Sequence, residues 1–214
     1  MEDNRRNELM KVIKAGLSDY LNERQVDFVA PYFIDFPMRL KIVHVKKTYW
    51  GLCQYPRKKG ERYLITLVRS DMQGHFFMVF LHEIAHMLAH MQFGEEISAS
   101  HGKEWGSIVR NIMSKAITEG CFSPTETEIL SGCVKSYVPL TNAKLNTLEQ
   151  KIIKLYRPDV VRVDSLPMDA VFKLKNGMEM KFIKKLRKNY ECMELHSGKR
   201  YRVNPDAEVE SWRR

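Results

Sequence analysis

The sequence predicts an α+β protein in two parts: a larger N-terminal domain of helices and a small sheet, followed by a small β-module. Three observations support this division. Residues 76–89 form a mostly apolar stretch that suits a buried helix, and short strand-like segments precede it. From residue 164 onward, short alternating segments are separated by tight-turn sequences. With 214 residues, 44% of them hydrophobic, the chain can build a folded core.

The N-terminal part begins with apolar residues at helical spacing over Asn4–Asn22. Three strands are then expected, at Leu40–Val45, Tyr49–Tyr55 and Arg62–Val68. The loop Pro56–Gly60 between the last two strands is basic. Its side chains either are solvated or contact nucleic-acid phosphates, and the candidates for that contact are Arg57, Lys58 and Lys59.

The centre of the apolar helix reads His82-Glu83-Ile84-Ala85-His86. Residues i and i+4 of an α-helix lie on one face about 6 Å apart along the axis, so both imidazoles can face one ion. Glu83 lies one step round the helix, where a carboxylate can act on a metal-bound water without binding the metal. The motif is typical of hydrolytic zinc enzymes. The alternative is a core helix whose histidines bond to backbone groups.

A catalytic zinc ion usually takes three protein ligands and leaves its fourth position to water. The candidates for the third ligand are His90, Glu95, Glu96, His101 and Glu104. On a straight helix His90 would lie about 12 Å from His82, too far to share an ion. We expect His101 instead, because it directly precedes Gly102 and a helix predicted over Lys103–Thr118.

His82–His86, a fourteen-residue gap and then His101-Gly-Lys-Glu-Trp105 resemble the SprT-like metalloprotease family, of the SprT and Spartan type. Thr48-Tyr-Trp-Gly-Leu-Cys53 is similar to the family's Trp-Gly-Ser-Cys segment, with Leu52 in place of serine. Tyr63–Leu67 resembles the strand that follows that segment. The resemblance covers roughly residues 5–120.

The resemblance implies a zincin-like peptidase domain over residues 1–135. It implies Zn²⁺ as the cofactor, His82, His86 and His101 as its ligands, and Glu83 as the catalytic acid and base. It also implies protein substrates that are bound or crosslinked to DNA, as in DNA repair. Bacterial members of the family often end in a four-cysteine zinc ribbon, which this chain lacks.

The cysteines are scattered and contain no Cys-x-x-Cys pair; they are Cys53, Cys121, Cys133 and Cys192. Neither a structural zinc site nor a disulfide framework can be read from them. The chain has no N-terminal signal pattern and no apolar run near 20 residues. We therefore expect a reduced, cytoplasmic protein with no membrane partner.

Residues 136–163 are expected to be a connector that starts at Ser136–Pro139 and contains a bridging helix, Asn142–Tyr156. Residues 164–214 are expected to form a small SH3-like barrel. Its predicted strands are Ala170–Leu174, Glu179–Leu186, Tyr190–Leu195 and Arg200–Val203. The residues expected in its apolar interior are Val171, Phe172, Phe182, Ile183, Cys192, Leu195, Tyr201 and Val203.

The net charge of +9 is concentrated near the C-terminus. Residues 135–214 carry 18 basic and 10 acidic side chains, a balance of +8. Basic side chains neutralise phosphates and aromatic rings stack on unpaired bases, so single-stranded or damaged DNA is a candidate partner, with Tyr190 and Tyr201 available for stacking. A solvated face is the alternative. The candidate contact residues are Lys181, Lys184, Lys185, Arg187, Lys188, Arg200 and Arg202.

The favoured function is therefore a zinc metalloendopeptidase that acts on proteins associated with DNA. The main alternative is a nucleic-acid-binding protein whose zinc site is structural or regulatory, and a fourth protein ligand would indicate this function. A hydrolase that acts on a non-protein amide would use the same site.

Overall fold

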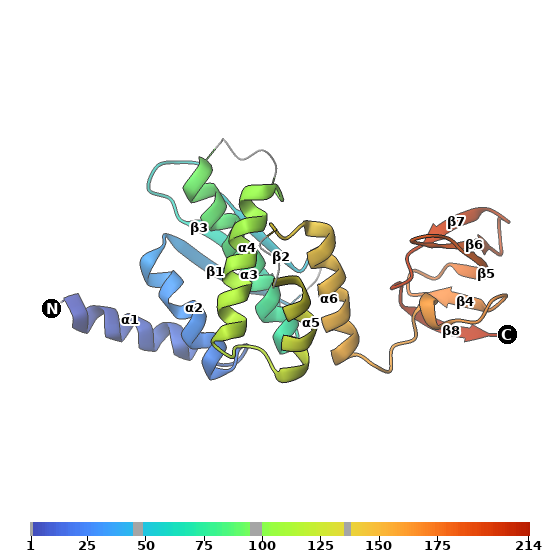
Figure 1. Ribbon diagram of the computed structural model, residues 1–214, viewed down its shortest axis with the longest axis horizontal. Coiled ribbons are helices and arrows are strands. Elements are labelled where there is room, and N and C mark those ends of the chain that lie inside the picture. The colour runs from blue at the N-terminus through green and yellow to red at the C-terminus, as the bar shows by residue number, and fades with distance from the viewer. Residues whose placement is uncertain (1, 45–48, 95–99, 135–137) are drawn as a thin grey trace. The chain divides into compact units, whose positions relative to one another are not determined.

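The computed structural model describes the chain except for residues 1, 45–48, 95–99 and 135–137 (Figure 1). Several predictions concern residues outside this description: Val45 as a strand end, Thr48 in the family-like segment, Glu95 and Glu96 as candidate ligands, and Ser136 and Tyr137 in the connector. The described chain combines helices with two sheets in an α+β architecture. It divides into two compact units, Met1–Ile153 and Lys154–Arg214.

The first unit contains most of the helices and a three-stranded sheet. Its helices are α1 (Glu2–Leu17), α2 (Glu23–Asp35), α3 (Gln73–Phe93), α4 (Lys103–Thr118), α5 (Pro124–Val134) and α6 (Asn142–Tyr156), the last of which runs a few residues past the boundary. Its strands are β1 (Met38–Val43), β2 (Gly51–Gln54) and β3 (Tyr63–Val68). The structure confirms the helices predicted over Lys103–Thr118 and Asn142–Tyr156.

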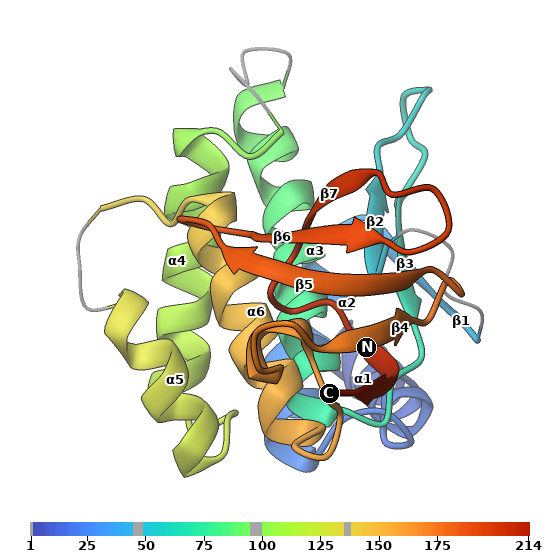
Figure 2. The same ribbon diagram turned by 90° about the vertical axis from the view of Figure 1, so that its right-hand side faces the viewer.

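The sheet has the order β1-β3-β2, in which β3 pairs in parallel with β1 and antiparallel with β2. The central strand β3 has almost all of its side chains buried. In Figure 2, α3 lies between this sheet on one side and α4 and α5 on the other. Strand β2, at the edge of the sheet, contacts α3 and so lies beside the helix that carries the two histidines.

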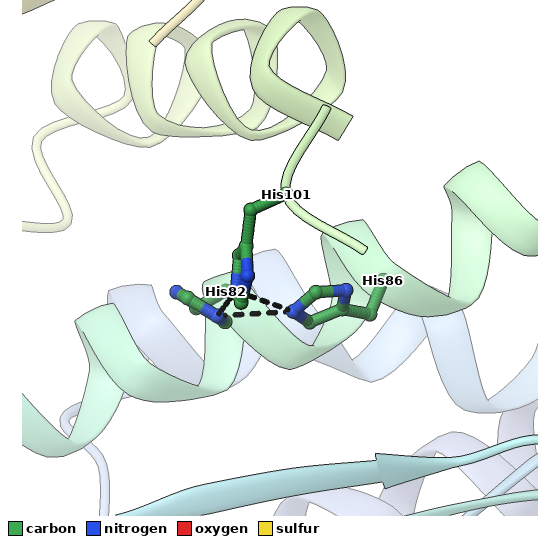
Figure 3. Close-up of side chains that lie close together, drawn as sticks. All are labelled: His82, His86 and His101. Carbon is green, nitrogen blue, oxygen red and sulfur yellow. Dashed lines mark hydrogen bonds between the residues drawn. The ribbon is translucent and has the colours of Figure 1, made fainter. Parts of the chain in front are cut away.

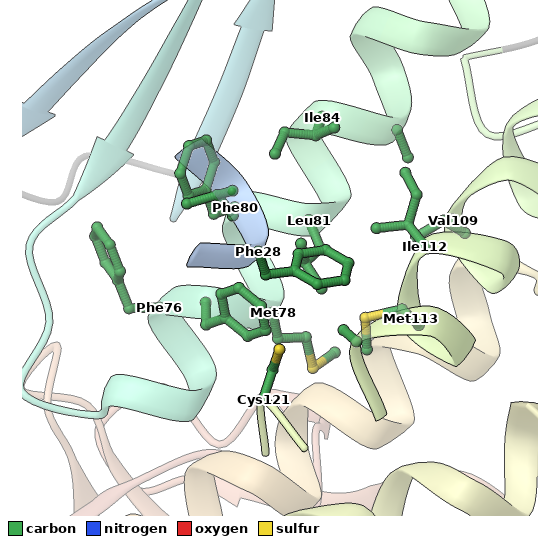
Figure 4. Packing of buried hydrophobic residues seen from close by; sticks show 14 of the residues in the cluster. Phe28, Phe76, Met78, Phe80, Leu81, Ile84, Val109, Ile112, Met113 and Cys121 are labelled. Atoms are coloured by element: carbon green, nitrogen blue, oxygen red, sulfur yellow. The ribbon is translucent and has the colours of Figure 1, made fainter. Parts of the chain in front are cut away.

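Helix α3 is the centre of the first core because nearly every face of it is apolar and covered. Phe77, Phe80 and Leu81 are fully buried. Figure 4 shows α3 residues meeting Phe28 of α2 and Met113 of α4. The mostly apolar character of residues 76–89 thus reflects contact with neighbours on all sides.

Helix α6 adds its apolar face to the same core through Leu145, Leu148 and Ile152. The chain reaches α6 by crossing α4 at Gly106, where Leu140 N–H donates a hydrogen bond to Gly106 O at 3.0 Å. A Cβ on Gly106 would lie 2.6 Å from Leu140 O, so only glycine permits this crossing. The helix predicted as a bridge is therefore, through its apolar face, part of the first core.

The second unit contains the short 3₁₀ helix η2 (Val163–Ser165) and a five-stranded antiparallel sheet of order β7-β6-β5-β4-β8. The strands are β4 (Val171–Leu174), β5 (Glu179–Lys185), β6 (Tyr190–Glu194), β7 (Arg200–Val203) and β8 (Val209–Arg213). Strand β8, which was not predicted, returns to pair with β4, the first strand of the sheet. Strand β5 has an irregular register between Phe182 and Lys184.

The core of the second unit differs in part from the expected interior. Phe172, Phe182, Cys192 and Val203 are buried as expected. Val171 and Ile183 are only half-buried, because they alternate with buried neighbours on β4 and β5. The predictions for Leu195 and Tyr201 were wrong, since their side chains are about 40% exposed. The core is completed by residues that the prediction omitted, which are Val163, Leu166, Ala170, Met180, Tyr190 and Val209.

Candidate metal centre

Three histidine side chains from two parts of the first unit converge on one point (Figure 3). His82 and His86 project from the same face of α3, and His101 reaches them from the segment just before α4. The Nε2 atom of His86 lies 3.1 Å from that of His82 and 3.2 Å from that of His101, and the His82 and His101 atoms are 3.2 Å apart. The structure thus brings together the three histidines that the sequence singled out.

The spacing of the three nitrogens fits a tetrahedral zinc site. With Zn–N bonds of about 2.0–2.1 Å, two ligands on a tetrahedral ion lie roughly 3.3 Å apart. The observed separations of 3.1–3.2 Å are close to that value. The donor set and its spacing therefore suit one metal ion with a position left for water.

The imidazoles are held in the form that binds a metal. Burial lowers the pKa of His82 to about 3 and that of His86 to about 4, and the neighbouring imidazoles act in the same direction. Burial also lowers the pKa of His101. All three rings are therefore neutral near pH 7, and a neutral ring can offer an Nε2 lone pair to a cation.

Trp105, on the first turn of α4, packs against all three histidine rings. Its ring centroid lies 4.8 Å from that of His82, 5.3 Å from that of His86 and 4.6 Å from that of His101. The side chain is fully buried, and its Nε1 has no hydrogen-bond partner among the described residues. Trp105 therefore fixes ring orientation by shape alone, a role that its apolar spacing in the sequence did not reveal.

Glu83 lies beside the histidines and against the edge strand β2. Its side chain is buried, and the backbone N–H of Cys53 donates a hydrogen bond to its carboxylate. Burial raises the pKa of Glu83 to about 8, although the hydrogen bond from Cys53 acts in the opposite direction. A carboxyl group whose pKa lies near neutrality can both take up and release a proton at pH 7.

Gly51 at the start of β2 makes room for this carboxylate. A Cβ there would lie 2.6 Å from Glu83 Oε1 and 2.7 Å from a methyl carbon of Val79. Gly51 belongs to the segment that resembles the Trp-Gly-Ser-Cys pattern. The close approach gives a physical reason for glycine at this position.

A cavity of about 150 Å³ opens beside His82 and Glu83. Its other walls come from the start of β2, the preceding turn of α3 and helix α6. The lining residues are Trp50, Gly51, Met78, Val79, His82, Glu83, Leu145 and Glu149. The candidate metal centre therefore faces a space that can receive part of a substrate.

The structure separates two other candidate ligands from the centre. His90 Nδ1 is 2.8 Å from the hydroxyl of Tyr63, and its ring stacks on Tyr55 with centroids 4.0 Å apart. Within the described residues, the group of potential metal ligands consists of the three histidines and does not include Glu104. His90 instead helps to attach the end of α3 to the sheet.

The candidate contact residues of the second unit are exposed or half-buried, and several of them pair with carboxylates. Lys181 pairs with Asp169 at 3.0 Å, and Glu191 pairs with both Lys184 at 3.6 Å and Arg200 at 2.7 Å. Arg202 lies directly across from Glu191 on β7. This face therefore has more positive than negative charge, but one carboxylate lies in its centre.

The aromatic residues expected to stack on bases are arranged differently from the prediction. Tyr190 is buried and packs on Phe182 with centroids 4.9 Å apart, so its ring is not available to a base. Tyr201 is 40% exposed and remains available. Trp212 on β8, which the sequence reading did not single out, is 45% exposed. The loop with Arg57, Lys58 and Lys59 is exposed, and Glu61 closes it by accepting the N–H groups of Arg57 and Lys58.

Comparison with known proteins finds a family model that matches the part of the chain around the histidine centre. Residues 29–128, which include α3, His101 and α4, match the model of the SprT-like family. The matched stretch is similar to members of the SprT-like family over just under half of the chain. The family resemblance seen in the motifs is thereby confirmed for a stretch that contains all three histidines and Glu83.

Curated relatives share a shorter stretch with the chain. Protein SprT from Pseudomonas putida strains GB-1 and W619 is 37% identical over 51 residues. That stretch is 24% of this chain and 30% of each relative, so the chain spans less than a third of their length in these matches. No solved structure matches the chain significantly. None of the described helices combines the length and apolar character needed to cross a bilayer.

Proposed function

We propose that the chain is a zinc-dependent peptidase of the SprT-like type, with a zincin-like catalytic domain. The observation that carries the proposal is the meeting of three neutral Nε2 donors at 3.1–3.2 Å with a buried glutamate beside them. His82, His86 and His101 would hold the metal. The SprT-like match over the same residues supports this assignment.

A zinc ion in this position would polarise the scissile carbonyl and lower the pKa of a water molecule. Glu83 would take the proton from the attacking water on its carboxylate and later deliver it to the leaving amine. The Cys53 N–H holds that carboxylate against β2, and Gly51 leaves the space for it. The apolar side chains of Met78, Val79 and Leu145 would limit the access of other water to the cavity.

The main alternative function, a structural or regulatory zinc site, requires a fourth protein ligand. Within the described part of the chain, the candidate ligands number three, and a cavity lies next to them. This arrangement favours hydrolysis, because a catalytic zinc keeps one position for water. A non-protein amide as substrate would use the same geometry, and direct assays must separate these cases.

Glu83→Gln provides the decisive test. The variant should bind about one equivalent of zinc, as the wild type does, and lose peptide hydrolysis by roughly 10² to 10⁴-fold, since only the proton acceptor is changed. Zinc would be measured by plasma mass spectrometry and hydrolysis with an unfolded protein and with a protein crosslinked to DNA. Glu128→Gln, which alters an exposed glutamate of α5, is the matched control.

The metal assignment is tested separately with His101→Ala, which should lose the bound zinc. Full zinc retention in this variant would move the third ligand elsewhere. Unchanged turnover in Glu83→Gln would remove this residue from the mechanism.

We also propose that the basic second unit attracts DNA, so that the peptidase acts on proteins bound or crosslinked to it. The supporting observations are the +8 balance after residue 134 and the exposed rings of Tyr201 and Trp212. The strands of this unit form an antiparallel sheet of order β7-β6-β5-β4-β8, in which β8, the last strand in the sequence, pairs with β4, the first. This topology supports an SH3-like barrel for the unit. Hydrolysis of the crosslinked protein should rise when single-stranded DNA is supplied, whereas an unfolded free protein should show no such dependence.

A further inference from the structure

The cavity beside the candidate metal centre has a chemical asymmetry. Its walls combine His82 and Glu83 of the candidate metal centre with apolar side chains and with Glu149 of α6. Glu149 is held by His75, whose Nε2 is 2.9 Å from Glu149 Oε1. Helix α6, which supplies this wall, lies beyond the stretch that matches the family model.

Within the described residues, the pairing with Glu149 leaves one nitrogen of the His75 ring without a partner. The Nδ1 atom of His75 is buried and has no hydrogen-bond partner among the residues that the structure describes. A protonated ring would place an N–H there with no acceptor, which is costly. The geometry therefore favours the neutral ring with its proton on Nε2, which donates to Glu149. The pair as a whole then carries one negative charge.

The dimensions of the cavity fit a long side chain. His75 precedes His82 by seven residues on α3, which corresponds to roughly 10 Å along the helix. A lysine side chain reaches about 6 Å from Cα to Nζ, and a hydrogen bond to a carboxylate adds about 3 Å. A residue of a substrate whose backbone lies near the metal could therefore place a terminal cation at Glu149, with its methylene groups along Met78, Val79 and Leu145.

We propose that this cavity is a specificity pocket for a lysine or arginine side chain of the substrate polypeptide, with Glu149 as the residue that recognises the cation. This inference rests on the proposed peptidase function. The apolar walls suit the stem and the single carboxylate suits the charged end. Trp50 also lines the cavity. Its ring packs edge-on against the ring of His75, with the ring centroids 4.8 Å apart, and fixes the back of the pocket.

Cleavage-site mapping tests the proposal on the full-length, zinc-loaded protein. A peptide mixture is digested and the sites are read by mass spectrometry. The wild type should favour Lys and Arg at one position next to the scissile bond. In a matched peptide pair that contains Lys or norleucine at that position, kcat/KM should be about tenfold higher for Lys, as expected for a partly buried ion pair of roughly 1.4 kcal/mol.

Glu149→Gln should reduce the Lys-over-norleucine ratio to about twofold or less, because glutamine keeps the shape and the hydrogen bond from His75 but not the charge. Both peptides are compared in one preparation, so a general loss of activity would lower both rates and leave their ratio unchanged. Glu128→Gln should retain the full ratio. Glu149→Lys should shift the preference toward Glu, a gain that misfolding cannot imitate.

Two negative results have different meanings. Equal cleavage of the Lys and norleucine peptides by the wild type would overturn the specificity pocket and leave the peptidase function in place. Cleavage of no peptide at all would contradict the proposed function. In that case, NMR titration with Nα-acetyl-lysine methylamide tests whether the pocket binds a lysine side chain. Saturable chemical-shift changes of the Met78 and Leu145 methyl groups that disappear in Glu149→Gln would support the pocket. The absence of such changes in the wild type would overturn it.

Discussion

At the scale of single residues, the position of Glu83 depends on the absence of a side chain at Gly51. The carboxylate occupies the space that a side chain on β2 would fill, and the Cys53 N–H holds it there. A new methyl group at position 51 would meet two groups: the carboxylate at the end of the flexible Glu83 side chain and a methyl group of Val79. A methyl at position 51 would therefore move the carboxylate more readily than the backbone.

We expect Gly51→Ala to lower kcat by about 10-fold or more with little change in zinc content, because a small displacement of a proton acceptor is costly for catalysis. Peptide hydrolysis and bound zinc would be measured on the same preparation. Gly16→Ala is the control, since a Cβ at Gly16 of α1 meets no atom within 4 Å. Normal turnover in Gly51→Ala would show that Glu83 does not need its observed position.

Trp105 offers a second residue-scale prediction. Its ring contacts all three imidazoles, and its buried N–H has no partner among the described residues. Trp105→Phe should therefore weaken zinc binding by about 10-fold, in the range of other groups that orient metal ligands, while the protein stays folded. Competition with a chromophoric chelator gives the zinc affinity, and circular dichroism checks the fold. An unchanged affinity would mean that the rings are oriented without Trp105.

The sequence predicted the histidines but not the residues that hold them. The His82 to His86 spacing is local to one helix, so the sequence alone places both rings on one face. Trp105 and the His75–Glu149 pair depend on how α3 meets α4 and α6, which no periodicity reports. The aromatic assignment of Tyr190 was wrong for the same reason: an alternating strand does not say which of its faces the rest of the unit covers.

At the scale of elements, helices α2 and α5 were not predicted, although both carry a start signal. Asn22 and Gln25 bond reciprocally at the beginning of α2, and Ser123 and Glu126 do so at the beginning of α5. Both are capping boxes, which local chemistry alone can predict. Pro31 inside α2 disfavours a helix, but tertiary packing of Phe28 and Val29 outweighs the hydrogen bond that proline cannot donate.

Glu126 also links two helices, because its carboxylate fills the space beside Gly74 on the first turn of α3. Gly74→Ala should destabilise the protein by about 1–3 kcal/mol, since the new methyl would overlap Glu126 Oε1 and displace a buried carboxylate. Gly132→Ala on α5, where a Cβ meets nothing, should instead stabilise by about 0.5–1 kcal/mol. Urea denaturation would measure the free energy of unfolding of both variants. Equal values for the two would contradict the close contact between Glu126 and Gly74.

At the scale of the whole molecule, charge is unevenly distributed along the chain. In the second unit, Glu191 of β6 lies among Lys184 of β5 and Arg200 and Arg202 of β7. The sequence predicted the excess of charge because charge is additive. It could not predict the internal pairing, which depends on the register of the strands.

Glu191→Gln should strengthen binding to single-stranded DNA by about two- to fivefold at low salt and steepen its salt dependence, because a repulsive charge is removed from a phosphate-binding face. The cost in stability should be small, since Lys184 and Arg200 are well exposed. Fluorescence anisotropy over a salt series would measure the affinity. Asp159→Asn changes the net charge equally at an exposed position outside this face, and the same gain there would argue against a localised contact.

The convergence of His82, His86 and His101 also has a thermodynamic consequence. A metal ion shared by α3 and by the segment that begins α4 would act as a reversible crosslink and close a loop of about fifteen residues between His86 and His101, which in a disulfide of that span is worth roughly 3 kcal/mol. The free concentration of zinc would then set the stability of the folded chain. Chelation should lower the melting temperature of the wild type and leave that of His101→Ala unchanged.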